Sequence, residues 1–382
     1  MSAVLAEKPE APAGAWRDQR RWLWWSALIV PLLPFVAFAL SRWVHSDWIW
    51  WIGPVVLYGV IPVLDHLIGT DRANPPESAV AALAHDPYYH RLIRLFLVVQ
   101  YAALLLGAWV AVSGGLGWIG LIGLVLTIGI VSGGGINAAH ELGHQRGGAL
   151  LAKIALAPSA YGHFLVEHNR GHHVRVATPE DPASARLGES YWRFLPRTLV
   201  GSLKSAWALE KARLAKSGKS AWHPTNELLQ AWGLSVALFL GLSLVFGWAV
   251  LPFLLLQAAY GASLLETVNY IEHYGLLRQR DGNGRYERCR PEHSWNSNHL
   301  VTNLMLYQLQ RHSDHHAHPT RPYQALRHFD HSPQLPAGYA ALVPIAYLTP
   351  LWYRLMNQRV LAHYDHDLSR CNVQPGYRPA SS

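Results

Sequence analysis

Cysteine and charged residues are scarce in this sequence. Its 382 residues include only two cysteines, Cys289 and Cys371, which lie far apart and form no CxxC pair. A disulfide framework is therefore excluded, and so is a four-cysteine iron site made by this chain alone. Charged residues make up 15% of the sequence and hydrophobic residues 51%. The charges are also unevenly distributed, since four long segments contain none: residues 22–40, 48–64, 95–139 and 228–265.

The uncharged segments predict six membrane-spanning helices. About 20 apolar residues cross a hydrocarbon core of roughly 30 Å, so the two longest segments have room for two spans each. The first of these breaks at the glycine-rich residues 113–117 and the second near Gly247. A soluble protein with six buried helices is disfavoured, because the chain has too little polar surface. The sequence therefore predicts an all-α integral membrane protein with spans at residues 22–44, 48–68, 92–112, 116–139, 228–246 and 249–271.

The connecting segments differ in charge. The turns at 45–47, 113–117 and 246–248 contain no Lys or Arg, whereas residues 1–21, residues 140–227 and the tail after 273 are basic. By the positive-inside rule, both termini and the large loops are cytoplasmic. The net charge of +8 then needs no nucleic-acid partner.

Three regions follow from this topology. They are a mobile tail (1–21), a six-helix transmembrane domain (22–271) with a cytoplasmic insertion (140–227), and a cytoplasmic C-terminal region (272–382). Residues 338–356 are apolar but interrupted by Pro344 and Pro350, so we expect an interfacial segment and no seventh span. Residues 280–290 contain turn-forming residues that predict a small hairpin.

Nine of the 22 histidines occur in four clusters near the cytoplasmic ends of apolar segments. The clusters are His140 and His144; His168, His172 and His173; His273; and His312, His315 and His316.

In the first cluster, the string HELGH continues directly from the fourth span. Histidines at i and i+4 share one helix face and can reach one ion, with Asn137 one turn earlier on that face. Taken alone, the string also matches HExxH, the zinc-protease helix in which the Glu is a general base.

The second and third clusters each contain three histidines. His168 and His172 repeat the i, i+4 pair, and the adjacent His173 points to a different side, which suits a second metal. The third cluster has histidines at i, i+3 and i+4.

His273 stands alone but shares a helix face with Glu266 and Asn269. Polar groups at the end of an apolar span are costly unless they serve a site. Because the fourth and sixth spans end on the same side of the membrane, all nine histidines can converge on one face.

Several carboxylates lie beside these histidines in the sequence. They can accept the free N–H groups of metal-binding rings or bind a metal directly, and the sequence leaves both alternatives open. These residues are Glu141, Glu167, Glu266, Glu272 and Asp314.

The number of histidines limits which metal-dependent reactions the site could catalyse. Imidazole suits zinc, copper, iron and nickel, so the ligand type alone does not select the metal. Nine ligands divide into four plus five, more than a hydrolytic zinc needs. Two metals beside the hydrocarbon region suit oxygen activation on an apolar substrate. A membrane zinc protease leaves seven of the histidines without a role, and a metal transporter needs ligands that cross the bilayer.

The strings HELGH, EHNRGHH, NYIEHYGLLR and LQRHSDHH, in this order, resemble the membrane alkane 1-monooxygenase family. This family lies within the membrane fatty-acid desaturase and hydroxylase superfamily, whose other members are the chief alternative. The resemblance spans about residues 20–360 and includes Asp181-Pro182. It implies a di-iron enzyme of the bacterial inner membrane, with the nine histidines as ligands of two iron ions. The implied reaction is O₂-dependent hydroxylation of medium-chain n-alkanes to 1-alkanols, with electrons passed from NADH through rubredoxin reductase and rubredoxin.

Two further expectations follow from this resemblance. The alkane should enter from the bilayer between spans two, three, four and six, with Leu57, Ile61 and Ile130 along its path. Rubredoxin in this family is acidic, so a basic cytoplasmic patch should receive it. The candidate residues for this patch are Arg146, Arg170, Arg175, Arg285, Arg288 and Arg290.

Overall fold

Helices make up nearly all the regular structure of the chain. The structure is a computed structural model, and it describes residues 16–377. Within this range there are no strands, only four isolated β-bridges. The predicted all-α class is therefore confirmed.

Six helical segments are long and apolar enough to cross a membrane, which confirms the predicted number of spans. The first joins η1 (Leu23–Leu28) to α1 (Ile29–Val44), and the second joins η2 (Asp47–Trp51), α2 (Ile52–Val55), η3 (Val56–Val60) and α3 (Ile61–Ile68). The other four are α5 (Pro87–Val112), α6 (Trp118–His144), α11 (Glu227–Phe246), and η6 (Trp248–Val250) with α12 (Leu251–His273).

Local sequence explains where these spans begin and end. The side chain of Asp86 accepts a hydrogen bond from the Tyr88 amide and caps α5, and Asn226 caps α11 in the same way. Gly247 ends α11 with a φ of 84°, a conformation that favours glycine. Because α6 continues to His144, the first histidine pair is part of the fourth span's own helix.

The helices α6 and α12 cross at close range. A Cβ atom on Gly261 of α12 would lie 2.9 Å from the Gly129 carbonyl oxygen and 3.0 Å from the Gly133 nitrogen of α6. Small residues at a helix crossing allow backbones to approach in this way. The helices that end in His144 and His273 are therefore packed directly against each other.

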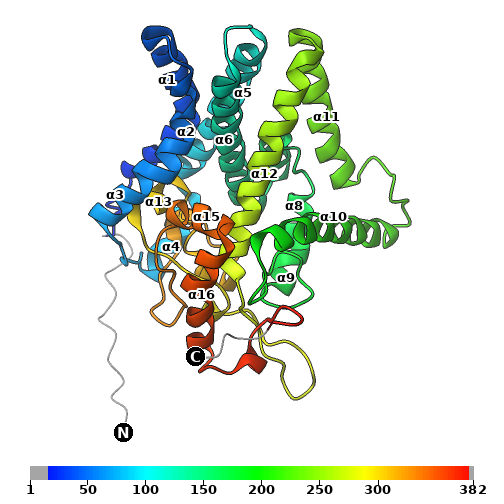
Figure 1. The fold of residues 1–382 in the computed structure, drawn as a ribbon. Helices are drawn as coiled ribbons and strands as arrows, with labels where there is room; N and C mark the ends of the chain where they lie inside the picture. Colours follow the sequence, from blue (N-terminus) through cyan, green and yellow to red (C-terminus); the bar gives the residue numbers. More distant parts are fainter. Residues whose placement is uncertain (1–15, 378–382) are drawn as a thin grey trace.

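Most of the remaining helices gather at one end of the spans (Figure 1). We call this end of the molecule the site side. Its α-helices are α4 (Glu77–His85), α8 (Phe164–Glu167), α9 (His173–Arg175), α10 (Tyr191–Ala215), α13 (Leu300–Met305), α14 (His312–Ala317), α15 (Tyr339–Tyr347) and α16 (Thr349–His363). Its shorter helices are η5 (His168–His172), η7 (Pro291–His293), η8 (Tyr323–Ala325) and η9 (Leu368–Arg370). By contrast, α7 (Ala149–Leu156) and η4 (Ala157–Ser159) reach in among the spans, where the Ala155 carbonyl accepts a hydrogen bond from Gln100 and the Pro158 carbonyl accepts one from Gln257.

Three further predictions from the sequence concern segments outside the six spans. The segment 338–356 forms α15 and the start of α16, and neither is among the six candidate spans. A bridge between Arg280 and Tyr286 closes the expected hairpin. Of the expected mobile tail, residues 1–15 lie outside the described residues, whereas Arg20 and Arg21 form ion pairs with Asp71 and Asp86.

Candidate metal centre

The four histidine clusters meet at the site side, where they form two groups. His140 and His144 lie in the last turns of α6, and His273 is the last residue of α12. The other six come from η5, α9 and α14. Within each group, one ring nitrogen of every histidine lies within 4.8 Å of the others. The first group, here called the five-histidine group, contains His140, His144, His168, His173 and His315, and the four-histidine group contains His172, His273, His312 and His316.

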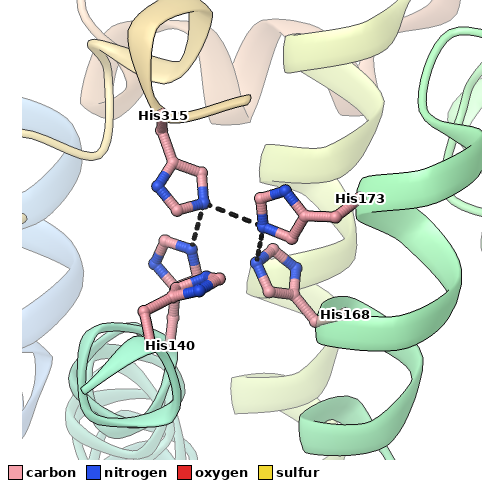
Figure 2. Close-up of side chains that lie close together, drawn as sticks. His140, His168, His173 and His315 are labelled. Atoms are coloured by element: carbon pink, nitrogen blue, oxygen red, sulfur yellow. Dashed lines mark hydrogen bonds between the residues drawn. The ribbon is translucent and has the colours of Figure 1, made fainter. Parts of the chain in front are cut away.

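In the five-histidine group the Nε2 atoms point toward one another. The Nε2 atom of His315 lies 2.8 Å from that of His140 and 3.1 Å from that of His173. The Nε2 atoms of His173 and His168 are 3.0 Å apart. Figure 2 shows these four rings converging, with His168 and His173 on one helical segment and His140 and His315 on two others. His144 completes the group with an Nε2 atom that is buried and has no hydrogen-bond partner.

The Nε2 atoms of the four-histidine group also lie close to one another. The Nε2 atom of His316 lies 2.8 Å from that of His312 and 3.2 Å from that of His172. The Nε2 atoms of His312 and His273 are 3.3 Å apart. All four residues of this group are buried, whereas His144 and His173 of the other group are partly exposed.

These distances suit metal coordination. Two nitrogen ligands about 2.1 Å from one ion and at right angles to each other are separated by about 3 Å. Burial, aided by the neighbouring rings, lowers the pKa values of five of the six clustered histidines outside the membrane spans well below 6.5, so these five rings are neutral and can donate lone pairs. The donor set therefore fits two metal ions. The five residues with lowered pKa values, which come from both groups, are His168, His173, His312, His315 and His316.

The pairing expected for the second cluster is wrong. The sequence predicts that His168 and His172 share an ion, but the structure places His168 with His173 and assigns His172 to the other group. The reason is local, because residues His168–His172 form a π-helix. Its wider turn brings residues i and i+5 onto one side, and single π-turns often occur at functional sites. In α6 and α14, the i, i+4 pairs do stay together.

Two carboxylates contact the four-histidine group. Asp181 is fully buried, and its Oδ2 atom lies 2.9 Å from His172 Nδ1 and 2.6 Å from the Ser184 hydroxyl. Burial alone would raise its pKa, but His172 and Ser184 outweigh burial and lower the pKa of Asp181 to about 2. This anion holds the His172 ring with Nε2 free for a metal. Asp181 was not among the predicted site residues, and its position after the second cluster was the only signal for it.

Glu272 lies on the metal-facing side of the four-histidine group. Its Oε2 atom is 3.1 Å from His312 Nε2, and its Oε1 atom accepts a hydrogen bond of 2.8 Å from the Tyr339 hydroxyl. A carboxylate oxygen is thus placed among the metal-binding nitrogens of the group that has one histidine fewer.

The other predicted neighbours are more distant from the histidine nitrogens. Glu141 lies 3.6 Å from His140 Nδ1 and accepts a hydrogen bond from the Tyr323 amide. Asp314 accepts hydrogen bonds from His318, Arg321 and the Arg327 amide, and no described histidine of either group bonds to it.

Glu167 and Glu266 face a small polar cavity of about 10 Å³, roughly the space of one water molecule. His168 of one group and His172 of the other also line this cavity, as does Asn269. Glu167 forms an ion pair of 2.7 Å with Arg175, and burial nevertheless raises its pKa to about 7.

Glu266 accepts hydrogen bonds from the Tyr161 hydroxyl (2.5 Å), the Thr198 hydroxyl (2.8 Å) and the Asn269 amide (3.3 Å). This polar cluster ties α12 to α10 beside the metal centre.

An apolar cavity of about 90 Å³ approaches the centre from the membrane. Of the three residues predicted to line the substrate path, Leu57 and Ile130 do line this cavity, and Ile61 packs against two of its lining residues, Met305 and Ala340. Asn137 and Leu309 also line it, and each is three residues from a clustered histidine in the sequence. The cavity is formed by spans one, two, three, four and six, by residues 305–309 and by α15. The contributions of span one, residues 305–309 and α15 were not expected.

The arginines predicted to form a docking patch divide into two sets. Arg170 pairs with Glu210 and Glu227, and Arg175 pairs with Glu167, so their charges are already neutralised inside the protein. The other four arginines are exposed. They are Arg146, Arg285, Arg288 and Arg290.

The fold and the site together define a class: a helical membrane protein with histidine-rich sites for two metal ions. A family model described as "Fatty acid desaturase" matches residues 116–346. The chain is 47% identical over 370 residues to the alkane 1-monooxygenase of Acinetobacter baylyi, covering 94% of this chain and 90% of that protein. It is 44% identical over 382 residues to alkane 1-monooxygenase 1 of Alcanivorax borkumensis (98% and 94% covered) and 43% identical over 380 residues to the alkane 1-monooxygenase of Ectopseudomonas oleovorans (98% and 93% covered).

The chain therefore belongs to the alkane 1-monooxygenase family, within the wider fatty acid desaturase family.

Proposed function

We propose that the protein is a di-iron alkane 1-monooxygenase that hydroxylates the terminal carbon of medium-chain n-alkanes, with rubredoxin as its electron donor. The observation that carries this proposal is an apolar cavity among the membrane spans whose lining leads to the two histidine groups through Asn137, one turn before His140, and Tyr339, which bonds to Glu272. The reaction adds one oxygen atom to the alkane and reduces the other to water with two electrons and two protons. The names of the relatives supply the substrate class.

Iron is the metal that best suits this chemistry at a histidine-rich site supported by carboxylates. Bound iron would supply the reductive activation of O₂. His140, His144, His168, His173 and His315 would hold one ion, and His172, His273, His312 and His316 the other. Asp181 fixes the His172 ring, and the Tyr339 hydroxyl orients Glu272 toward His312.

The apolar cavity would hold the alkane and exclude water. An n-alkane already partitions into the bilayer, so its natural entrance lies between helices. Ile130 and Leu57 lie along the cavity, and Tyr339 borders both the cavity and Glu272. Enlarging Ile130 to Phe should shorten the preferred alkane, and reducing it to Ala should lengthen the preferred alkane, because the terminal carbon must reach the same point. Product profiles from mixtures of octane, decane and dodecane would show the shift, and an unchanged profile in both variants would contradict this role.

The electron donor would bind the exposed basic residues on the site side. Arg285, Arg288 and Arg290 lie on or beside the small hairpin, and Arg146 follows α6. An acidic rubredoxin, reduced by NADH through its reductase, would be attracted by these charges. Electron transfer should therefore slow as ionic strength rises.

The excess of Lys and Arg on the site side supports a cytoplasmic location for this side and for both termini, in a bacterial inner membrane. This orientation would place the metal centre on the same side as soluble rubredoxin and NADH.

Metal analysis combined with turnover tests the proposal. The purified protein, reconstituted with rubredoxin, its reductase and NADH, should contain two iron atoms per chain and convert octane to 1-octanol. A fatty acyl substrate should give no product. Desaturated or hydroxylated acyl products in place of 1-octanol would favour the desaturase alternative, and a single zinc ion would overturn the di-iron assignment.

A further inference from the structure

The helix α10 runs across the ends of the spans on the site side (Figure 1). Near its start, the Tyr191 hydroxyl bonds to the Ser263 carbonyl, and the Thr198 hydroxyl bonds to Glu266. Near its end, Glu210 accepts a hydrogen bond of 2.7 Å from the Glu227 amide, at the first residue of α11. Both halves of α10 are thus attached to membrane spans.

These attachment points lie at the membrane boundary. At 1.5 Å per residue, Glu266 is about 27 Å along the sixth span from Trp248, and Glu227 is about 28 Å along α11 from Phe246. Both distances are close to the hydrocarbon thickness of roughly 30 Å. Because its two halves meet two spans at this same depth, α10 lies along the surface of the membrane.

The outward face of α10 is apolar. Trp192, Val200 and Leu203 recur at helical spacing, and they are 60%, 52% and 42% exposed. Trp207 continues this stripe and lies parallel to Trp232 of α11, with 6.2 Å between the ring centroids. Trp222, which is 72% exposed, also packs against Trp207, in an edge-to-face contact. The apolar surface of α10 is therefore continuous with a membrane span.

A row of cations borders this stripe. Arg193, Lys204 and Lys211 lie on one edge of α10, separated by 11 and 7 residues, and all three are exposed. None of them forms an ion pair with a described carboxylate. An apolar stripe beside a basic edge is the pattern of a helix that lies in the membrane interface, where long cationic side chains reach the lipid phosphates.

We infer that α10 is a membrane-surface anchor whose apolar stripe enters the acyl boundary of the site-side leaflet and whose basic edge binds anionic phospholipid headgroups. The opposite face of α10 supports the metal centre. Thr198 bonds to Glu266, and Ser205 accepts a hydrogen bond of 2.6 Å from Arg175, which in turn pairs with Glu167 beside His168. Lipid bound on one face of α10 therefore stabilises residues that surround the histidine groups.

The burial of α10 in lipid can be tested with spin labels. Cysteine is introduced by Leu203→Cys in a Cys289→Ser/Cys371→Ala background, and the matched control is Ala208→Cys, an exposed position about 140° away around the same helix. In vesicles of phosphatidylcholine and phosphatidylglycerol, the label at 203 should be accessible to O₂ and shielded from an aqueous nickel chelate. The label at 208 should show the reverse.

Equal exposure of the two labels to the nickel chelate would overturn the proposal. Shielding at 203 that appears only after an acidic partner protein is added would do so as well, because the apolar stripe would then be a protein-docking surface. Retained metal content in each variant shows that the labelled proteins are folded.

The headgroup contact has a separate test. The parent protein should unfold at a higher temperature in nanodiscs with phosphatidylglycerol than in nanodiscs with phosphatidylcholine alone. Lys204→Ser/Lys211→Ser should lose most of this difference, whereas Arg354→Ser/Arg359→Ser, which removes two exposed charges from α16, should keep it. If the parent shows no difference, or if the Lys204/Lys211 variant retains all of it, the phospholipid-binding edge is wrong. Neither variant changes a residue of the metal centre, so these outcomes are independent of the reaction catalysed.

Discussion

The two histidine groups differ in composition and in exposure. The five-histidine group has partly exposed members, His144 and His173, and its nearest carboxylate, Glu141, makes no hydrogen bond to a ring of the group. The four-histidine group is buried throughout and contacts Asp181 and Glu272. Fewer imidazoles are thus combined with more carboxylate support. The comparison indicates that one site relies on ligand number and the other on ligand orientation.

Removing one histidine from each group should show the difference between the groups most strongly. His273→Ala leaves three imidazoles in the buried group, so we expect loss of one iron and a fall in alkane turnover of about 1,000-fold or more. His144→Ala leaves four imidazoles, so the variant should retain more of its second iron. Iron content per chain and turnover measure both effects. Equal iron loss in the two variants would contradict the comparison.

The carboxylates provide the next test. Asp181→Asn removes the anion that fixes His172, and metal affinity at the four-histidine group should fall by about 10- to 100-fold. Glu141→Gln is the matched change beside the other group and should alter affinity by less than about 10-fold, because Glu141 makes no hydrogen bond to a ring. Iron titrations of the metal-free variants would show both values, and a larger effect for Glu141→Gln would reverse the assignment.

Chelation should distinguish the groups by exposure. A strong chelator should remove the ion held by His144 and His173 several times faster than the ion held in the buried group, because water and chelator reach partly exposed ligands first. Iron release followed over time should show two phases. A single phase that accounts for both ions would mean that the sites open together.

Acid should affect the two groups alike, so the difference between them should be smallest in this experiment. Burial lowers the pKa values of His168, His173, His312, His315 and His316 in the folded chain, whereas the unfolded chain takes up protons near pH 6.5. The metal-free protein should therefore keep its full stability above about pH 6.5 and lose stability as the pH falls below that value. Thermal unfolding between about pH 7.5 and 5.5 measures this loss, and a melting temperature that rises on acidification would contradict it.

Much of this organisation follows from the sequence because it depends on local pattern. Uncharged runs predict the spans, and the membrane sides on which the fourth and sixth spans end place His140 and His273 together. The i, i+4 pairs in α6 and α14 also behave as an α-helix requires. The wrong pairing of His168 arises from a π-turn, which the sequence pattern does not reveal.

Other features depend on tertiary packing. Asp181 reaches His172 only because the chain turns back after the second cluster. The contribution of α15 to the apolar cavity comes from a segment more than 200 residues from Ile130 in the sequence. The position of α10 along the membrane surface depends on its attachments at Glu266 and Glu227, which no local pattern predicts.

The glycine crossing of α6 and α12 has a mechanical consequence. Gly261 lies twelve residues before His273, a lever arm of about 18 Å along the helix. A rotation of about 3° at the crossing would displace the end of α12 by about 1 Å relative to α6, several times the roughly 0.2 Å by which metal–ligand distances vary. The alignment of the two histidine groups is therefore governed partly by small residues within the membrane spans, at a distance from any of the nine histidines. A single methyl group added at Gly261 would act on the metal centre through geometry alone.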